Sequence, residues 1–196
     1  ERVGSSRMSK VFVQPPEAAH DIDSAISQTV EAYTSLSKDK VGALMVFERA
    51  NLLDEVIKTG TALDCAVSSE LLKNLFWNKA PLHDGAVIVR NGRIVGAGCM
   101  LPLSGNTNLS RDLGMRHRAG IGMSEHSDAV VAIVSEETGS ISVAVGGMLK
   151  RHLAPETLDR LLRNELKTDE DDGEKKSDLF PLVAALFNRG KKEGTE

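Results

Sequence analysis

Two apolar runs, 86–89 and 93–100, are separated by a short polar turn that contains Asn91 and Gly92. Asn-Gly is the strongest short-range signal for a β-hairpin, because both central residues of its turn need positive φ. The two runs are apolar on both faces of the expected strands, so each face needs cover from other elements. The hairpin therefore predicts a β-sheet at the centre of the domain.

Further strands are indicated by short apolar runs that contain many strand-forming residues and are too short for typical helices. They lie at 41–47, 128–135, 140–145 and 148–150. Helices are indicated by apolar residues at helical spacing and by residues suited to helix starts, such as Ser68 and Pro155. The expected helices cover 21–38, 69–77, 113–124 and 155–166. Together these elements predict an α/β fold with a central mixed β-sheet flanked by helices on both faces.

The two ends of the chain differ in composition from its middle. Residues 1–19 are mixed and polar with two consecutive prolines, which is typical of an extended lead-in and of a link to an upstream membrane anchor. Residues 169–174 hold five acidic side chains in six positions, so 167–196 is expected to be an acidic linker and charged tail without ordered structure. We therefore expect one domain over 20–166.

Composition restricts the classes of partner. The formal net charge of −4 and the low aromatic content argue against binding to a nucleic acid polymer, which selects a basic surface and stacking platforms. Cys65 and Cys99 lie among apolar neighbours, which favours two free thiols over a disulfide.

No apolar run approaches the ~20 residues that span a bilayer, so this chain is expected to be soluble. It begins with Glu1 rather than Met, which suggests a piece of a longer protein.

Polar residues interrupt the expected strands at His83-Asp84-Gly85, directly before the hairpin. Sites on α/β sheets usually lie at strand ends. An Asp followed by Gly can place a carboxylate there while the backbone approaches a ligand closely. Taken alone, these residues also fit an Asx turn that leads into a strand.

A second polar segment is Arg116-His117-Arg118, in the expected helix 113–124. Residues 116 and 118 do not share a face in mid-helix, but in a first turn or loop both guanidinium groups could converge on one polyanion. Arginine donors match phosphate oxygens, and free N–H groups at a helix start add favourable partial charge. Taken alone, the segment also fits a solvated basic patch.

A third segment, Ser135-Glu136-Glu137-Thr138-Gly139, follows an expected strand. A carboxylate here could join Asp84 on a divalent cation, since Mg²⁺ favours one or two carboxylates together with phosphate oxygens. Taken alone, the segment also fits an ordinary acidic β-turn. The sequence contains no P-loop and no GxGxxG motif, which disfavours those two nucleotide-binding folds.

The three segments, in this order and spacing, resemble the diadenylate cyclase domain family, and within it the membrane-anchored CdaA type. Asp-Gly-Ala at 84–86 and Arg-His-Arg at 116–118 match the two signature motifs of that family. Gly-Cys-Met-Leu-Pro-Leu-Ser at 98–104 and Ser-Glu-Glu-Thr-Gly at 135–139 complete the pattern. The resemblance implies a nucleotidyltransferase that condenses two ATP into cyclic di-AMP, at the cytoplasmic face of the cell membrane in the full-length protein.

The resemblance also implies residue roles. The catalytic residues would be Asp84, Arg116, His117 and Arg118. The nucleotide would contact Gly85, Ala86, Met100, Leu101, Met115, Arg116, His117, Arg118 and Ser135. A divalent cation, Mg²⁺ or Mn²⁺, would be bound by Asp84, Glu137 and His83. Met100 and Met115 stand where the family often has an aromatic residue and a Thr.

The symmetry of the product implies a further requirement. Each ATP must act once as nucleophile and once as electrophile, so we expect a homo-oligomer with facing active sites during catalysis. The family resemblance also implies regulatory partner proteins. The alternative is a non-catalytic module of the same fold that senses adenine nucleotide or cyclic di-AMP. Retention of Asp84 and Glu137 favours the enzyme, because a sensor has no need for metal-binding carboxylates.

Overall fold

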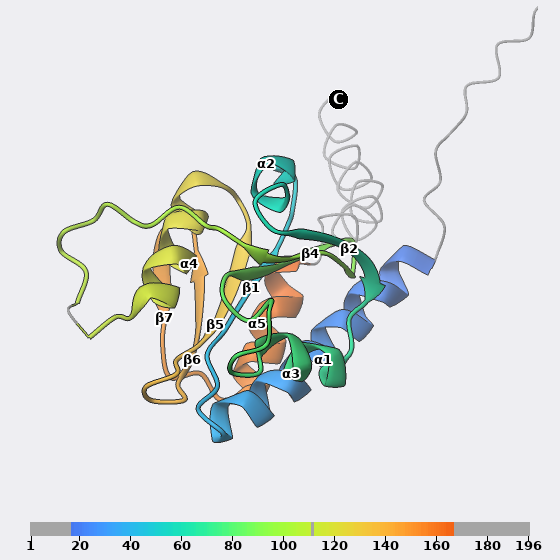
Figure 1. Ribbon diagram of the computed structural model, residues 1–196, viewed down its shortest axis with the longest axis horizontal. Helices are drawn as coiled ribbons and strands as arrows, with labels where there is room; N and C mark the ends of the chain where they lie inside the picture. The colour runs from blue at the N-terminus through green and yellow to red at the C-terminus, as the bar shows by residue number, and fades with distance from the viewer. Residues whose placement is uncertain (1–16, 111, 167–196) are drawn as a thin grey trace, which may run out of the picture.

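The computed structural model describes residues 17–110 and 112–166, in which seven strands form one sheet (Figure 1). In chain order, the strands are β1 (Ala43–Phe47), β2 (Thr61–Ala66), β3 (Ala86–Arg90), β4 (Arg93–Cys99), β5 (Val130–Val134), β6 (Ile141–Val145) and β7 (Met148–Lys150). Their order across the sheet is β2-β4-β3-β1-β5-β6-β7. The pairing of β1 with β3 is parallel and the other pairings are antiparallel, so the sheet is mixed, as predicted.

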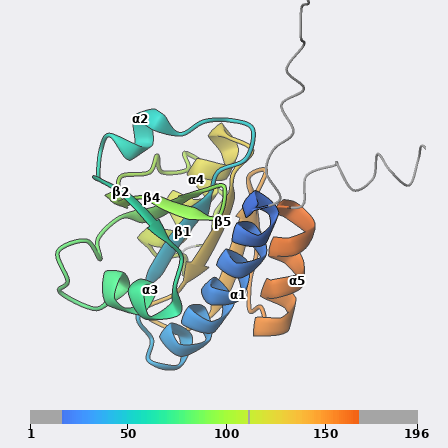
Figure 2. The same ribbon diagram turned by 90° about the vertical axis from the view of Figure 1, so that its right-hand side faces the viewer.

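Helices cover both faces of the sheet, which confirms the predicted fold class. The helices are α1 (Glu17–Lys38), α2 (Asp54–Ile57), α3 (Ser69–Phe76), α4 (Met115–His126) and α5 (Pro155–Leu166). Helices α1, α3 and α5 pack on one face, and α1 and α5 lie side by side (Figure 2). Helices α4 and α2 pack on the other face.

The apolar character of the strands on both faces follows from these two helical layers. In β1, Ala43, Met45 and Phe47 are buried in the layer that contains α1, α3 and α5. Leu44 and Val46 are buried in the layer that contains α4. A strand with two buried faces has no solvent-exposed side chain to alternate with, which is why the runs in the sequence are continuously apolar.

The predicted hairpin is confirmed in its turn and in its pairing. β3 and β4 are antiparallel, and Arg90 pairs with Arg93 across the turn. Both turn residues have positive φ, 49° at Asn91 and 74° at Gly92. The cap predicted at Ser68 is also confirmed, because its side chain accepts a hydrogen bond from the N–H of Leu71 at 3.2 Å.

Helix α4 contains two glycines because it is packed tightly on two sides. A Cβ at Gly120 would lie 2.7 Å from Cδ1 of Ile133 in β5. A Cβ at Gly122 would lie 2.3 Å from the carbonyl oxygen of Pro102, in the segment that follows β4. Glycine has a low helix propensity, but at these two positions it allows the helix to approach the sheet and this segment closely.

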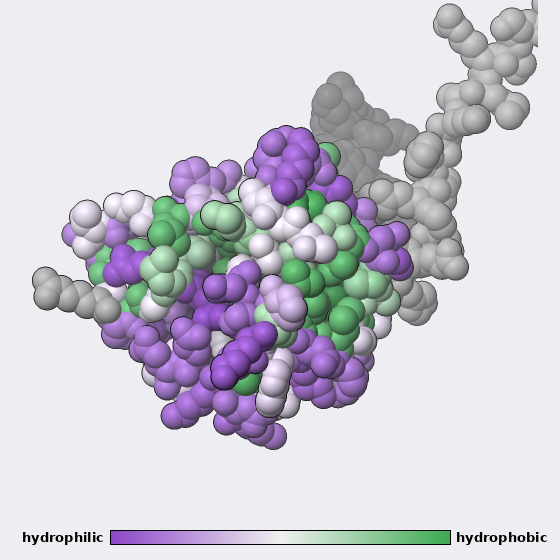
Figure 3. All heavy atoms as spheres, viewed as in Figure 1, coloured by the Kyte–Doolittle hydropathy of each residue, from purple (hydrophilic) through white to green (hydrophobic). Residues whose placement is uncertain are grey.

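Two elements were not predicted. Helix α2 is a single turn, held by a hydrogen bond from the N–H of Leu53 to the Glu48 carboxylate. Strand β2 lies at the edge of the sheet and keeps exposed side chains, and its register with β4 is irregular. Its sequence, Thr-Ala-Leu-Asp-Cys-Ala, contains residues that are poor strand formers, so no strand pattern is visible. Figure 3 shows apolar atoms gathered on the surface over β2 and β4.

The first helix starts earlier than predicted. Helix α1 begins at Glu17, so the last residues of the predicted lead-in 1–19 belong to its first turn. The rest of that lead-in and the predicted tail 167–196 lie outside the described residues.

Cys65 and Cys99 are free thiols, as predicted. Over 17–110 and 112–166, no helix combines the length and apolarity needed to cross a membrane.

Candidate active site

The register of the three central strands brings the polar segments to one end of the sheet. Met45 of β1 pairs with Val87 of the parallel strand β3, so both strands start at the same end. Ala43 of β1 pairs with Val134 of the antiparallel strand β5, so β5 finishes at that end. Strands lie ~4.8 Å apart, which places the backbones just before β3 and just after β5 roughly 10 Å from each other.

The start of β3 is fixed by a glycine that no other residue could replace without a shift. Gly85 has a φ of 109°, and a Cβ on it would lie 2.6 Å from the carbonyl carbon of Gly98 in β4. This close approach fixes the loop before β3 against the end of β4. Asp84 is exposed on that loop, and Nδ1 of His83 lies 2.6 Å from the carbonyl oxygen of Ala80. The predicted carboxylate is thus available to a ligand at the end of the sheet.

The first turn of α4 lies at the same end. Its N-cap, Gly114, provides no side-chain hydrogen bond, so the N–H groups of the first turn remain available to an anion. A small pocket joins this turn to the end of β5. It is lined by Gly114, Met115, Arg116, His117, Val134, Ser135, Glu136 and Glu137. The second and third polar segments of the sequence therefore share one pocket.

The two arginines of the second segment have different surroundings. Nη1 of Arg116 is 2.7 Å from Oε2 of Glu136, and the Arg116 side chain is only 18% exposed. Arg118 is half-buried, and its Nε donates to the carbonyl oxygen of Leu113 at 3.3 Å. Arg116 lines the pocket, whereas Arg118 is not among the lining residues. The expectation that both guanidinium groups could converge on one polyanion stays a prediction, and of the two side chains Arg116 lines this pocket.

His117 lines the pocket but is largely buried, and its Nε2 lies 3.3 Å from Oγ of Ser142 in β6. Burial lowers the pKa of His117 and the charge of Arg151 lowers it further, while Asp112 opposes this shift. The imidazole is therefore neutral at neutral pH, and it links α4 to β6 rather than adding a positive charge to the site.

The residues predicted to contact the nucleoside are also placed near this end of the sheet. Ala86 is the first residue of β3 and pairs with Cys99, directly before Met100 and Leu101. Met100 and Met115 are largely exposed, at 72% and 66%. The N–H of Met100 donates to Oγ1 of Thr59 at 2.8 Å, so the segment between α2 and β2 supports the backbone of Met100.

Comparison with known proteins assigns the family. The family model described as DisA bacterial checkpoint controller nucleotide-binding, or DAC, matches residues 30–149. The chain belongs to the DAC family. The match contains all three polar segments and all of the pocket described above.

This DAC chain is similar to curated proteins and to solved structures. It is 45% identical over 155 residues to the cyclic di-AMP synthase CdaA of Bacillus subtilis (strain 168), covering 77% of the chain and 57% of that protein. It is 44% identical over 142 residues to a diadenylate cyclase of Listeria monocytogenes, covering 72% of the chain and 52% of that protein. The chain thus spans little more than half the length of these relatives.

Two solved structures have the same fold as the DAC chain. A crystal structure of DacA from Staphylococcus aureus, as a double mutant, superimposes with a TM-score of 0.74 at 42% identity and covers 76% of this chain and 99% of that one. A hypothetical membrane spanning protein from Bacillus cereus gives a TM-score of 0.63 at 46% identity, covering 65% of this chain and 63% of that one. At these identities the α/β fold described above is shared.

The metal-binding residues of the DAC domain stay a prediction. Glu137 lines the pocket at the first turn of α4, and Asp84 is exposed at the same end of the sheet. Across the described part of the chain, however, no three His, Cys, Asp or Glu side chains are grouped closely enough to hold a metal ion. His83, Asp84 and Glu137 are therefore not a preformed cluster. The carboxylate oxygens of Asp84 and Glu137 still suit Mg²⁺ or Mn²⁺ if phosphate oxygens complete the coordination.

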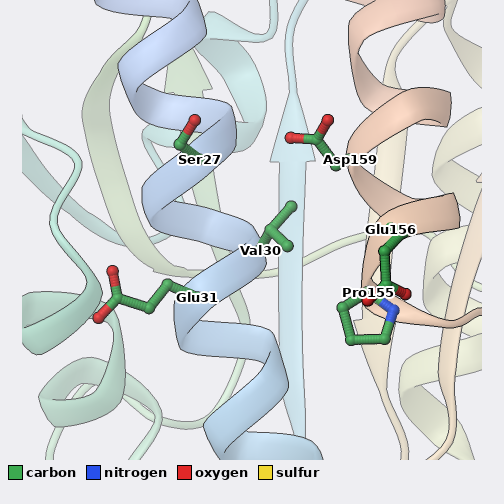
Figure 4. A pocket seen from close by; sticks show the side chains of 6 residues that line it. All are labelled: Ser27, Val30, Glu31, Pro155, Glu156 and Asp159. Atoms are coloured by element: carbon green, nitrogen blue, oxygen red, sulfur yellow. The ribbon is translucent and has the colours of Figure 1, made fainter.

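A larger cavity of the DAC domain, about 440 Å³, lies between α1 and α5, and Figure 4 shows the side chains that line it. Its lining residues are Ser27, Val30, Glu31, Pro155, Glu156 and Asp159. Three of them carry carboxylates and none is cationic, so the cavity would repel a triphosphate. Size alone would favour this cavity, but its charge excludes it as the nucleotide site.

Sequence reasoning missed two residues that shape the site, Gly42 and Thr59, and the role of a third, Glu136. Gly42 precedes β1 and leaves room for Arg116, Glu136 pairs with Arg116, and Thr59 supports Met100. A signal existed for Gly42, because a glycine at a strand start frequently marks close approach of another group. Glu136 was included in the acidic segment, but its partner lies on another element and is not visible in the sequence.

Proposed function

We propose that this DAC domain is a diadenylate cyclase, which condenses two ATP into cyclic di-AMP and releases two pyrophosphates. The observation that carries the proposal is the pocket shared by the first turn of α4 and the end of β5. It joins a cationic side chain and free helical N–H groups to carboxylates at one end of the sheet. The chain is also similar to proteins named for this activity.

Phosphate binding is assigned to the first turn of α4. Free N–H groups there carry partial positive charge, and Arg116 adds a guanidinium group in the same pocket. Arg118, which lies outside this pocket in one protomer, remains assigned to the phosphates through the family resemblance. Ser135 lines the pocket and offers a hydroxyl group, which already accepts a hydrogen bond from the N–H of Thr138 at 3.3 Å.

The chemistry is nucleotidyl transfer. The 3′-oxygen of each ribose attacks the α-phosphorus of the other ATP, the 3′-hydroxyl loses its proton, and the bond to pyrophosphate breaks. Asp84 and Glu137, with His83, would hold a divalent cation, which neutralises phosphate charge and favours loss of that proton. The chain itself provides alignment and electrostatic stabilisation, as is general for phosphoryl transfer.

The direct test is to incubate the purified chain with ATP and Mg²⁺ or Mn²⁺ and to identify the products by mass spectrometry. Cyclic di-AMP and two equivalents of pyrophosphate are expected. The alternative is a sensor of the same fold, which would bind ATP or cyclic di-AMP in calorimetry without turnover. Binding without product in the presence of either metal would support the sensor and refute the cyclase.

The reaction also needs two active sites that face each other, and from this follows a prediction on kinetics. If two protomers meet only transiently, the rate per enzyme at saturating ATP should rise with enzyme concentration and then level off. A small interface of this kind is expected to be micromolar or weaker. Initial rates over about two decades of enzyme concentration measure this dependence. A constant specific activity throughout would contradict a weak facing dimer.

The cellular location and the partners of the full-length protein are a further part of the proposal. We propose that it works at the cytoplasmic face of the cell membrane and responds to regulatory partner proteins. The support for the membrane is similarity to the Bacillus cereus protein, which is described as membrane spanning. The regulatory partners rest on the family resemblance stated above.

A further inference from the structure

The pairing of Arg116 with Glu136 differs from an ordinary surface ion pair. The Glu136 side chain is 60% exposed, but that of Arg116 is only 18% exposed. A guanidinium group removed from water to this degree needs a nearby negative charge or hydrogen-bond acceptors. The 2.7 Å contact between Nη1 and Oε2 provides both. The position of Arg116 is therefore determined by the protein itself, before any ligand arrives.

Gly42 provides the space that this arrangement needs. A Cβ on Gly42 would lie 2.7 Å from Cζ and from Nη1 of Arg116, and 3.0 Å from its Nε. Three guanidinium atoms thus lie against the backbone just before β1, where any other residue would place a side chain. The φ of Gly42 is not in the left-handed region, so the requirement for glycine here concerns space and not backbone conformation.

Arg116 also lies close enough to the buried side chain of Tyr33 for its charge to affect the pKa of that residue. Burial raises the pKa of Tyr33 well above its usual range, and the positive charge of Arg116 opposes that shift. Tyr33 is fully buried and its hydroxyl donates to the carbonyl oxygen of Ala132 at 2.9 Å. The guanidinium group therefore lies close to the core at the start of β1.

We propose that Glu136 and Gly42 are positioning residues, which fix the guanidinium group of Arg116 for the phosphates of the nucleotide. This inference rests on the proposed function of the pocket. A guanidinium group has five N–H donors, and Glu136 accepts from Nη1. The remaining donors stay available to phosphate oxygens. Because the group is already held, binding does not have to restrict a mobile side chain, which improves affinity.

The test compares Glu136→Gln and Gly42→Ala with two matched controls in the full chain. Glu156→Gln changes the same charge in the exposed first turn of α5, and Gly105→Ala adds a methyl group where no atom lies within 4 Å. The ATP dissociation constant from calorimetry and the KM are expected to rise roughly ten-fold in both test variants, with a smaller change in kcat. Both controls should match the wild type. Thermal unfolding confirms that the variants are folded.

A second readout does not depend on nucleotide binding. In the wild type, NMR signals of the Arg116 side-chain N–H groups should show restricted rotation, and this restriction should be lost in Glu136→Gln. If those signals are unchanged, the positioning role is refuted. Unchanged ATP affinity in folded Glu136→Gln also refutes it, and tighter binding would mean that Glu136 competes with phosphate instead. If the wild type fails to bind ATP, the proposed function fails, while the NMR comparison still decides whether Glu136 holds Arg116.

Discussion

Asp84→Asn is expected to leave the domain folded and to lower the formation of cyclic di-AMP more than about 100-fold. Groups that merely orient a metal ligand already change activity ~10–100-fold when they are removed, and loss of a ligand itself should cost more. An amide cannot replace the charge that the carboxylate provides to a divalent cation. Asp84 is exposed on a loop fixed by Gly85, so its replacement leaves no buried group without a partner.

The measurement is the initial rate of product formation, with thermal unfolding as the control for folding. Asp64→Asn is the matched variant, since Asp64 is an exposed residue of β2 that pairs with Arg93. Exposed pairs of this kind contribute little to stability, so this variant should retain wild-type activity. Product formation at the wild-type rate by folded Asp84→Asn would show that Asp84 does not bind the cation.

Gly122→Ala is expected to lower the thermal stability of the domain markedly, although alanine favours helices. The new Cβ would lie 2.3 Å from the carbonyl oxygen of Pro102 and 2.6 Å from the backbone nitrogen of Ser104. Both are backbone atoms, which cannot move aside as a side chain can. Overpacking costs about 1–3 kcal/mol and occasionally more. A backbone clash belongs at the upper end of that range, so it outweighs the gain of about 1 kcal/mol in helix propensity.

Gly120→Ala provides the matched comparison, because it gains the same helix propensity in the same helix. Its Cβ would lie 2.7 Å from Cδ1 of Ile133 and 3.2 Å from Cγ1 of Val131, which are side-chain and not backbone atoms, so its melting temperature should fall less than that of Gly122→Ala. Each kcal/mol corresponds to ~2–4 °C in a domain of this size, and calorimetry or circular dichroism resolves the difference. Equal melting temperatures for the two variants would mean that the Pro102 segment yields easily.

The parts of the fold that could be predicted depend on short-range physics. The turn at Asn91 and Gly92 requires positive φ, and the cap at Ser68 requires a side-chain oxygen, so neighbouring residues determine both. The strand β2 could not be predicted, because its exposed side chains follow no apolar pattern and its pairing depends on β4. The single turn of α2 is too short to show a helical pattern, and the carboxylate of Glu48, five residues before Leu53, holds its start.

The candidate site, like the fold, could be predicted from the sequence only in part. The three polar segments could be found from the sequence, and the sequence also indicated that residues 116 and 118 do not share a helical face. It could not indicate that Glu136 would pair with Arg116, because that contact depends on how α4 lies on β5. Nor could it separate the partly buried guanidinium of Arg116 from that of Arg118. Differences of this kind arise from tertiary packing and not from residue type.

The place of β1 in the sheet has a consequence for how activity is lost. β1 is the fourth of seven strands, and the polar segments of the site lie beside β1 and its two neighbours, β3 and β5. Both open edges of the sheet, β2 and β7, are separated from those three strands by β4 and β6. Local opening begins where few buried contacts must break, which is at such edges. Fraying of the edges would therefore leave the site assembled, and heat inactivation should coincide with global unfolding of the domain.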